Sequence, residues 1–186
     1  MSYYHNTTRR KVFISYYHGD QNDVNCFVQK FSDIFIAKTV GVKDGDFDIN
    51  SNDPQYVMRR IRETKLEDST VTIVLIGNCT HSRRYVDWEI KASLQQGQGL
   101  PNGLIGINLA YIKNQALAPD RLDNNWATDY SLYARYYVYP SSPSSLRGWI
   151  EDAFSARTER AHLIKNSNEM MKYNSVCKVH GINHGT

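Results

Sequence analysis

Apolar residues recur along the chain with two periods, which predict strands alternating with helices. Continuous β-branched and aromatic runs are typical of strands buried on both faces, and apolar residues spaced three and four apart are typical of amphipathic helices. The predicted strands cover 11–17, 39–42, 70–77, 103–109 and 133–139. The predicted helices cover about 20–35, 53–66, 82–96 and 142–154. This alternation predicts one flavodoxin-like α/β domain with three layers, in which helices flank a mostly parallel central sheet.

The length and the two ends of the chain bound its organisation. With 186 residues, 41% of them hydrophobic, the chain can bury one ordinary core. We expect a polar N-terminal extension at 1–10, the α/β domain at 11–166 and an aperiodic C-terminal tail at 167–186. The polar start lacks the apolar core of a secretion signal, and no apolar run approaches the roughly 20 residues that span a bilayer. These features predict a cytoplasmic protein that does not bind a membrane.

Charge and cysteine content exclude further classes of protein. The net charge is only +3 and basic residues are scattered, which argues against a nucleic-acid partner. Three widely spaced cysteines, Cys26, Cys79 and Cys177, predict reduced thiols and no disulfide framework. Cys177, His180 and His184 have metal-like spacing, but they offer only three ligands in an aperiodic tail. We favour a dispensable tail and expect no metal site.

The predicted topology selects one edge of the sheet as the ligand site. In flavodoxin-like sheets, ligands bind at the carboxyl ends of the strands, between the first and third strands. This rule selects 16–20, 78–84 and the start of the following helix, which are dense in polar and aromatic residues. The expected substrate-binding residues there are Ser15, Tyr16, Tyr17, His18, Ser82, Arg84, Tyr85 and Trp88. From the loop after the second predicted strand, Asp46 and Asp48 either close the crevice or are solvated turn formers.

Glu89 is the candidate for chemistry. It lies four residues after Tyr85, so both side chains share one line of the predicted helix, at the border of its buried stripe. A carboxylate at that border can be half desolvated while it faces the crevice, a setting in which proteins tune acid pKa values. The alternative is a solvated helix glutamate paired with Lys91 or Arg83. The pattern alone leaves both interpretations open.

The remaining patterns are less specific. Arg83 and Arg84 can hold phosphates together with the free backbone N–H groups of a helix start, or they form a solvated charge pair. His18 either contacts a ligand or is merely exposed. The aromatic segment 130–139 can stack bases, but it is better explained as one face of an edge strand. The sequence contains no Gly-rich phosphate loop and no Gly-x-Ser-x-Gly motif, so the corresponding nucleotide-binding and hydrolase classes are unsupported.

Two stretches carry a family resemblance. The strand 12–16 and the string Arg-Arg-Tyr-Val-Asp-Trp-Glu-Ile at 83–90 resemble TIR-like domains, and the second is similar to the TIR-like component of bacterial Thoeris anti-phage systems. The resemblance spans roughly 10–154. It implies a TIR-like version of the α/β fold and NAD as substrate, with no further cofactor. By this resemblance, Glu89 engages the nicotinamide ribose while nicotinamide departs and an oxocarbenium-like centre forms.

The resemblance also implies a signalling role. In the Thoeris branch an internal attack on that centre gives a cyclic ADP-ribose isomer, a diffusible messenger that activates a separate effector, whereas water gives ADP-ribose. We expect the chain to associate with further copies of itself and to respond to a phage-derived activator. Many bacterial TIR domains carry Trp four residues before the glutamate, where this chain has Tyr85, so the shape of the ribose pocket differs. Two alternatives remain: a non-catalytic scaffold that self-associates, and an enzyme that transfers ribosyl groups of nucleosides or nucleotides.

Overall fold

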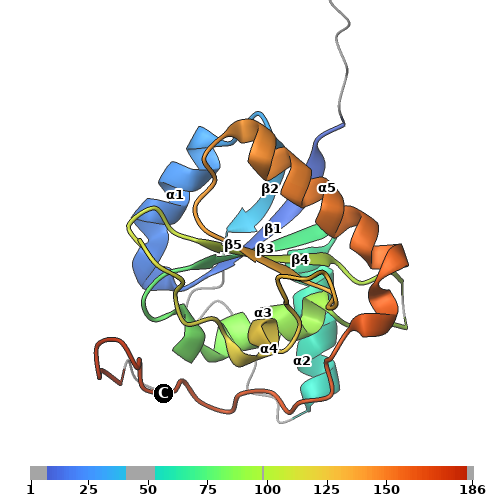
Figure 1. Cartoon of the computed structure of the whole chain (residues 1–186). Coiled ribbons are helices and arrows are strands. Elements are labelled where there is room, and N and C mark those ends of the chain that lie inside the picture. The colour runs from blue at the N-terminus through green and yellow to red at the C-terminus, as the bar shows by residue number, and fades with distance from the viewer. Residues whose placement is uncertain (1–7, 41–52, 98, 184–186) are drawn as a thin grey trace, which may run out of the picture.

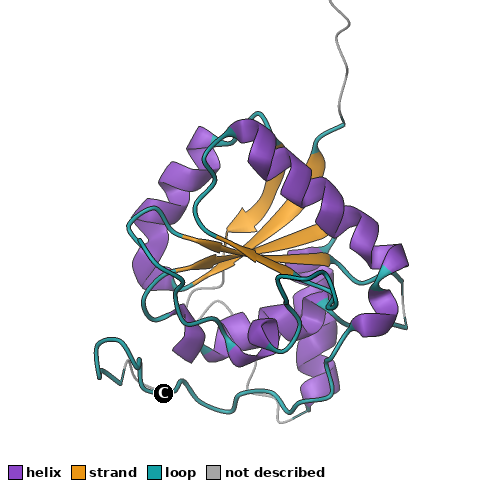
Figure 2. Cartoon of the chain, in the orientation of Figure 1, coloured by secondary structure: helices purple, strands orange, loops and turns teal. Residues whose placement is uncertain are grey.

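The computed structural model describes residues 8–40, 53–97 and 99–183. Its centre is a sheet of parallel strands covered by helices on both faces (Figures 1 and 2). The strands are β1 (Arg10–Tyr16), β2 (Phe35–Val40), β3 (Val71–Ile76), β4 (Gly103–Asn108) and β5 (Arg135–Tyr137). Their order in the sheet is β2-β1-β3-β4-β5. The predicted flavodoxin-like α/β fold, with a parallel sheet between two helical layers, is confirmed.

Helices of unequal length form the two outer layers. They are α1 (Gln21–Lys30), α2 (Pro54–Ile61), α3 (Arg84–Ser93), α4 (Asp120–Asp123) and α5 (Pro143–Glu159). Shorter helical turns are η1 (His18–Asp20), η2 (Arg62–Leu66), η3 (Thr80–Ser82) and η4 (Ala161–Leu163). In Figure 1, α1 and α5 cover the upper face of the sheet, and α2, α3 and α4 cover the lower face. No helix in the described ranges is both long and apolar enough to cross a bilayer.

Strand β1 divides its side chains between the two layers. Val12, Ile14 and Tyr16 belong to the core under α1 and α5, whereas Phe13 packs with α2 and α3. Since successive side chains of a strand point to opposite faces, Ser15 faces the same layer as Phe13. The strand therefore presents one buried hydroxyl to α3.

Two predicted helix starts are confirmed in atomic detail. The Asp53 side chain accepts a hydrogen bond of 2.9 Å from the Gln55 backbone N–H, and α2 begins at the following proline. The Ser142 hydroxyl accepts one of 3.1 Å from the Ser145 N–H, and α5 also begins with proline. Both ends combine a capping oxygen with a proline whose missing N–H would have no helical partner.

The predicted extent of the first helix and the position of the second strand are wrong. Helix α1 ends at Lys30, a turn covers 31–34, and β2 begins at Phe35. Phe31 and Phe35 lie in the same core as Val24, so the apolar period continues although the backbone has left the helix. Residues 41–42 of the predicted strand lie outside the described residues.

Differences elsewhere are smaller. Strand β5 covers three residues rather than the predicted 133–139. Helix α4 was not predicted, because four residues do not complete a recognisable apolar period.

The C-terminal segment, residues 164–183, lies along the outer side of α3 (Figure 1). The Met171 N–H donates to Asp87 Oδ2 at 2.9 Å, and its carbonyl oxygen accepts from Trp88 Nε1 at 2.8 Å. The Ser175 N–H donates to the Ser82 carbonyl oxygen at 3.0 Å. The predicted boundary at 166 stays a prediction, but the segment beyond it makes specific contacts with the helix that carries Glu89.

The prediction of reduced cysteines is wrong for two of them. Cys79 and Cys177, 98 residues apart, form a disulfide, whereas Cys26 is a free, exposed thiol. Their spacing gave no sign of this pairing, because it depends on the C-terminal segment folding back across the loop before α3.

Two glycines give a matched test of packing. A Cβ on Gly103 in β4 would lie 2.0 Å from the Ala153 carbonyl oxygen in α5, whereas one on Gly148 would meet open space. We expect Gly103→Ala to lower the free energy of unfolding by about 1–3 kcal/mol through overpacking. Gly148→Ala should raise it by about 0.5–1 kcal/mol, because glycine is costly inside a helix. Urea unfolding measures both, and the same sign for both variants would contradict this packing.

Candidate functional site

Glu89 and Ser15 meet between α3 and β1. The Glu89 side chain is only 2% exposed, and the Ser15 Oγ–H donates to its Oε2 at 2.5 Å. The glutamate is therefore more deeply buried than the half-desolvated position expected from the sequence. A carboxylate this deep needs hydrogen-bond donors to offset lost hydration, and Ser15 is one.

The solvated alternative for Glu89 is wrong. Lys91, its suggested partner, donates from Nζ to the carbonyl oxygens of Asn166 and Asn168, at 3.1 and 2.7 Å. Arg83 is itself buried beside Tyr17, with its guanidinium carbon 4.3 Å from the ring centroid. The Glu89 carboxylate thus lies in the interior between α3 and β1, and not on a solvated face of the helix.

Tyr16 lies within electrostatic reach of Glu89. Its ring is buried and its hydroxyl donates to Gln21 Oε1 at 2.6 Å. Burial raises the pKa of the Tyr16 hydroxyl, and the negative charge of Glu89 raises it further. The His18 ring stacks beside Tyr16, with 6.2 Å between centroids. Ser15, Tyr16, His18 and Glu89 therefore gather at the carboxyl end of β1, where the fold rule placed a site.

A second polar cluster lies over the end of β3 and was missed by sequence reasoning. Asp20 Oδ1 accepts a 2.8 Å hydrogen bond from the Tyr111 hydroxyl, which in turn accepts one of 3.3 Å from the Asn78 N–H. A Cβ on Gly77 would approach both side chains to 2.3 Å, so glycine permits their contact. Tyr111 follows β4 at the same edge, and extending the edge rule to that loop would have found it.

Asp20 should give a pH-dependent contribution to stability. Burial raises the pKa of its carboxyl, only partly offset by the Tyr111 hydrogen bond, so ionisation costs more in the folded than in the unfolded chain. The stability that neutral Asp20 contributes is therefore present below its unfolded pKa and is lost as pH rises through the folded one. Relative to Asp20→Asn, which cannot ionise, the wild type should be more stable at about pH 3 than at about pH 7. Urea midpoints of both proteins at the two pH values test this, and an unchanged difference would contradict it.

The aromatic group at the start of α3 turns toward the C-terminal segment. The Arg84 guanidinium carbon lies 4.9 Å from the Tyr85 ring centroid and 5.6 Å from that of Trp88, and the two rings meet edge to face. The Arg84 backbone N–H donates to Asn174 Oδ1 at 3.0 Å. One of the N–H groups suggested for phosphate binding is thus engaged by the C-terminal segment.

The predicted site residues therefore separate into groups. Ser15, Tyr16 and His18 lie with Glu89, whereas Arg84, Tyr85 and Trp88 lie together beside the C-terminal segment. Tyr17 stacks on Arg83, and the Ser82 hydroxyl donates to the Cys79 carbonyl oxygen at 2.8 Å, where it fixes the turn before α3. Asp46, Asp48 and His184 lie outside the described residues. The roles of all these residues stay predictions.

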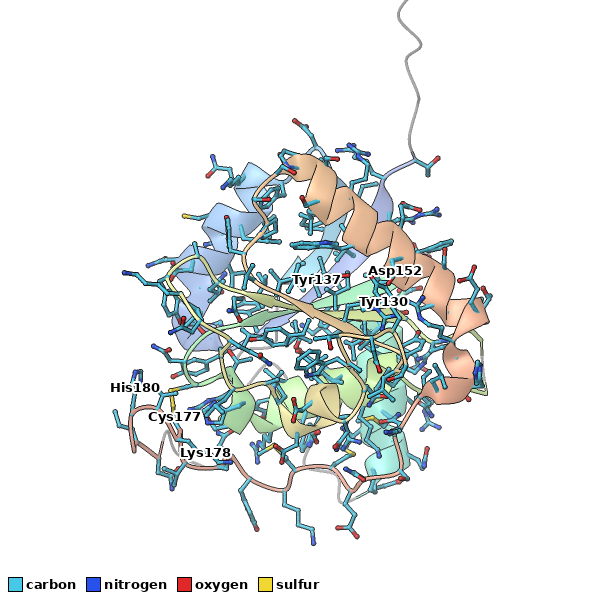
Figure 3. All side chains as sticks on the ribbon, viewed as in Figure 1. Tyr130, Tyr137, Asp152, Cys177, Lys178 and His180 are labelled. Carbon is cyan, nitrogen blue, oxygen red and sulfur yellow. A yellow bond between two sulfur atoms is a disulfide. The ribbon has the colours of Figure 1, made fainter. Side chains whose placement is uncertain are left out.

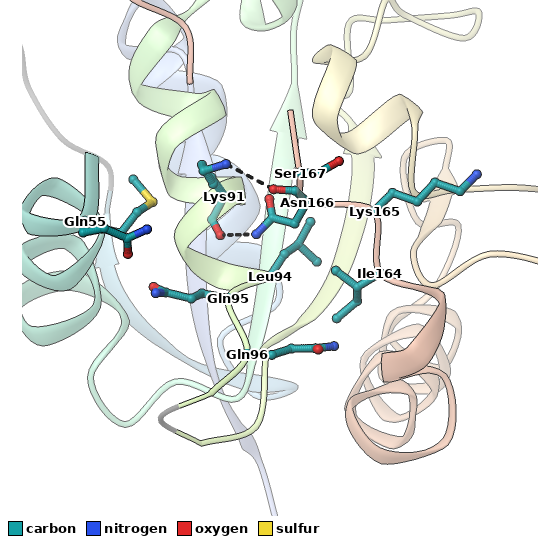
Figure 4. A pocket seen from close by; sticks show the side chains of 10 residues that line it. Gln55, Lys91, Leu94, Gln95, Gln96, Ile164, Lys165, Asn166 and Ser167 are labelled. Atoms are coloured by element: carbon teal, nitrogen blue, oxygen red, sulfur yellow. Dashed lines mark hydrogen bonds between the residues drawn. The ribbon is translucent and has the colours of Figure 1, made fainter. Parts of the chain in front are cut away.

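A cavity of about 510 Å³ lies at the C-terminal end of α3, whereas Arg84, Tyr85 and Trp88 lie at its start (Figure 4). Side chains from α2, the end of α3 with the residues just after it, and the C-terminal segment line it: Gln55, Met58, Lys91, Leu94, Gln95, Gln96, Ile164, Lys165, Asn166 and Ser167. Asn166 Nδ2 donates to the Lys91 carbonyl oxygen at 3.0 Å and closes one wall. Glu89 does not line this cavity, so the site at the end of β1 is separate from it.

Comparison with known families agrees with the fold. A family model described as the TIR-like domain of Thoeris protein ThsB matches residues 13–114. The match covers more than half of the chain, from β1 to the loop after β4, and includes Glu89. No curated protein matches the chain.

Proposed function

The chain belongs to the family of ThsB TIR-like domains, whose members are TIR-family proteins of Thoeris defence, and from this we propose that it cleaves NAD. In this proposal the chain breaks the nicotinamide–ribose bond and cyclises the ADP-ribosyl group. Glu89 is the proposed catalytic residue. The observation that supports it is the buried Glu89 carboxylate, hydrogen-bonded by Ser15 at the carboxyl end of β1.

The reaction needs a negative charge beside the ribose. When the bond between C1′ and nicotinamide breaks, the electron pair leaves with nicotinamide, which becomes neutral, and C1′ becomes cationic. A carboxylate held in a site of low dielectric stabilises that cation more than it stabilises the substrate. An oxygen of the same ADP-ribosyl group then attacks C1′ and loses its proton, which closes the ring.

The hydrogen bond from Ser15 suggests how the ribose is held. Glu89 is 2% exposed, so substrate reaches it only when neighbouring side chains move. A ribose hydroxyl offers the same O–H donor as Ser15 and can replace it at Oε2, so the carboxylate keeps its hydrogen bond while substrate binds. Ser15 is then a positioning residue, which holds the carboxylate in the free enzyme.

The proposed context is anti-phage defence. The cyclic ADP-ribose isomer is a diffusible messenger that reaches a separate effector protein, and a phage-derived signal together with self-association of the chain activates its synthesis. NAD is the substrate in this scheme and no further cofactor takes part. The proposed location is the cytoplasm, where NAD is available.

Incubation of the purified full chain with a substrate panel tests the reaction. The panel contains NAD, nucleosides, deoxynucleosides and nucleotides, and products are separated by chromatography and identified by mass. Nicotinamide together with a cyclic ADP-ribose isomer is the expected result when lysate of infected cells is added. Reaction of deoxynucleosides but not of NAD would favour a ribosyl-transferring enzyme, and no product under any condition would favour a self-associating scaffold.

A further inference from the structure

Three side chains of metal-binding types, from distant parts of the sequence, converge beside the turn before α3. Cys79 comes from the loop after β3, and Cys177 and His180 come from the C-terminal segment. Their ligand atoms, the two Sγ and the imidazole Nδ1, all lie within 4.8 Å of one another. Figure 3 shows Cys177 and His180 on one loop near the C-terminal end. The His180 Nδ1 faces Cys79 Sγ at 3.4 Å.

The loop from Cys177 to Ile182 is built to hold two of these ligands. Cys177 and Ile182 pair as an antiparallel bridge, and the Gly181 N–H donates to the Cys177 carbonyl oxygen at 2.7 Å. Gly181 has φ +65°, a left-handed conformation that favours glycine, and it turns the chain directly after His180. A spacing of two residues between ligands, on a tight turn, is typical of one half of a zinc site.

The loop is also fixed to the body of the protein through a backbone hydrogen bond that uses none of the three ligand atoms. The Lys178 N–H donates to His81 Nε2 at 3.1 Å, so His81 serves as a backbone acceptor rather than as a further ligand. The Cys177 and Cys79 side chains are buried, whereas His180 is exposed. An ion can therefore enter from the His180 side.

We propose that the reduced chain binds one zinc ion through Cys79 Sγ, Cys177 Sγ and His180 Nδ1. Zinc bonds of about 2.3 Å to sulfur and about 2.0 Å to nitrogen place tetrahedral ligands roughly 3.5–3.8 Å apart. The distance from His180 Nδ1 to Cys79 Sγ agrees with this spacing, and separation of the two sulfur atoms brings them into it. The fourth position faces solvent on the His180 side and takes water.

The disulfide and the zinc site are alternative states of the same two cysteines. A dithiol reductant transfers two electrons and two protons to the Cys79–Cys177 bond and becomes a disulfide itself, which leaves two thiols. Zinc then displaces the two thiol protons, and the neutral imidazole supplies the third ligand without proton loss. Either state adds a strong bond between the C-terminal segment and the loop before α3, beside the hydrogen bonds from Ser175 to Ser82 and from Lys178 to His81, and in a reducing compartment the metal replaces the disulfide in this role.

Cobalt binding to the full chain, kept reduced with a phosphine, tests the proposal. Tetrahedral thiolate–cobalt coordination gives a near-ultraviolet charge-transfer band and intense visible bands. We expect both to appear with one equivalent of Co²⁺ and to disappear when Zn²⁺ is added. Zn²⁺ should also slow tryptic cleavage at the exposed Lys172 and Lys178 in the reduced chain.

Matched variants separate this site from incidental binding. Cys79→Ser and Cys177→Ser should lose the charge-transfer band, and His180→Ala should weaken Co²⁺ binding while the exposed position of His180 leaves the fold intact. Cys26→Ser and His162→Ala, which change residues elsewhere, should bind Co²⁺ as the wild type does. Absence of thiolate bands in the folded, reduced wild type would overturn the proposal, as would bands that persist in Cys177→Ser.

Discussion

Glu89→Gln is expected to reduce release of nicotinamide from NAD by at least about 100-fold while the chain stays folded. Glutamine has nearly the same shape and keeps a carbonyl oxygen that accepts from the Ser15 hydroxyl. It lacks the negative charge that the proposed mechanism places beside the cationic ribose. Chromatography of nicotinamide released by equal amounts of wild type and variant, under conditions where the wild type is active, measures the change.

A matched control separates charge at this position from charge in general. Glu63 is an exposed glutamate in η2, near Arg60, and Glu63→Gln removes the same charge from a solvated site. It should turn NAD over at the wild-type rate. Thermal unfolding of both variants checks that the fold is kept, and wild-type turnover by Glu89→Gln would remove Glu89 from the mechanism.

Arg121→Met is expected to lower the free energy of unfolding by about 3–5 kcal/mol, because it leaves a buried charge without its partner. Arg121 Nε donates to Asp87 Oδ1 at 2.8 Å, and both side chains are almost completely buried. The same guanidinium donates to the carbonyl oxygens of Asn168 and Glu169, so its loss also frees the C-terminal segment from α3. Urea unfolding measures the stability, and limited proteolysis follows release of the segment.

The exposed pair between Arg60 and Glu63 supplies the comparison. Its closest nitrogen–oxygen distance is 4.0 Å and both side chains face solvent, so Arg60→Met should cost less than about 1 kcal/mol. If both arginine variants lost equal stability, the buried Arg121–Asp87 pair would not stabilise the fold more than the exposed pair does, which would contradict this interpretation.

Local sequence signals predicted the parts of this fold that short segments determine. The apolar run of β3 and the serine–proline start of α5 were recognisable because the composition and the cap act within a few residues. The neighbourhood of Ser15 and Glu89 followed from one further rule, the position of the ligand edge in a flavodoxin-like sheet. Periodicity failed after Lys30, where buried residues continue across a turn.

The remaining features depend on contacts between distant residues and leave no local signature. Asp20 and Tyr111, which share a hydrogen bond, are 91 positions apart in the sequence, and the disulfide-bonded Cys79 and Cys177 are 98 positions apart. The C-terminal segment lacked apolar period because backbone hydrogen bonds, rather than an apolar face, hold much of it to α3. The buried contacts of Asp87 and Lys91 were not predicted for the same reason, since their partners are backbone groups of that segment and the distant Arg121.

Nucleotide mass spectrometry of cells tests most directly the proposal that this chain makes a cyclic NAD-derived messenger through Glu89. Cells that express the wild type or Glu89→Gln are compared with and without phage infection. We expect a cyclic ADP-ribose isomer with the wild type after infection and none with the variant. Equal amounts of that isomer from the variant, or no NAD-derived product from the wild type under either condition, would contradict it.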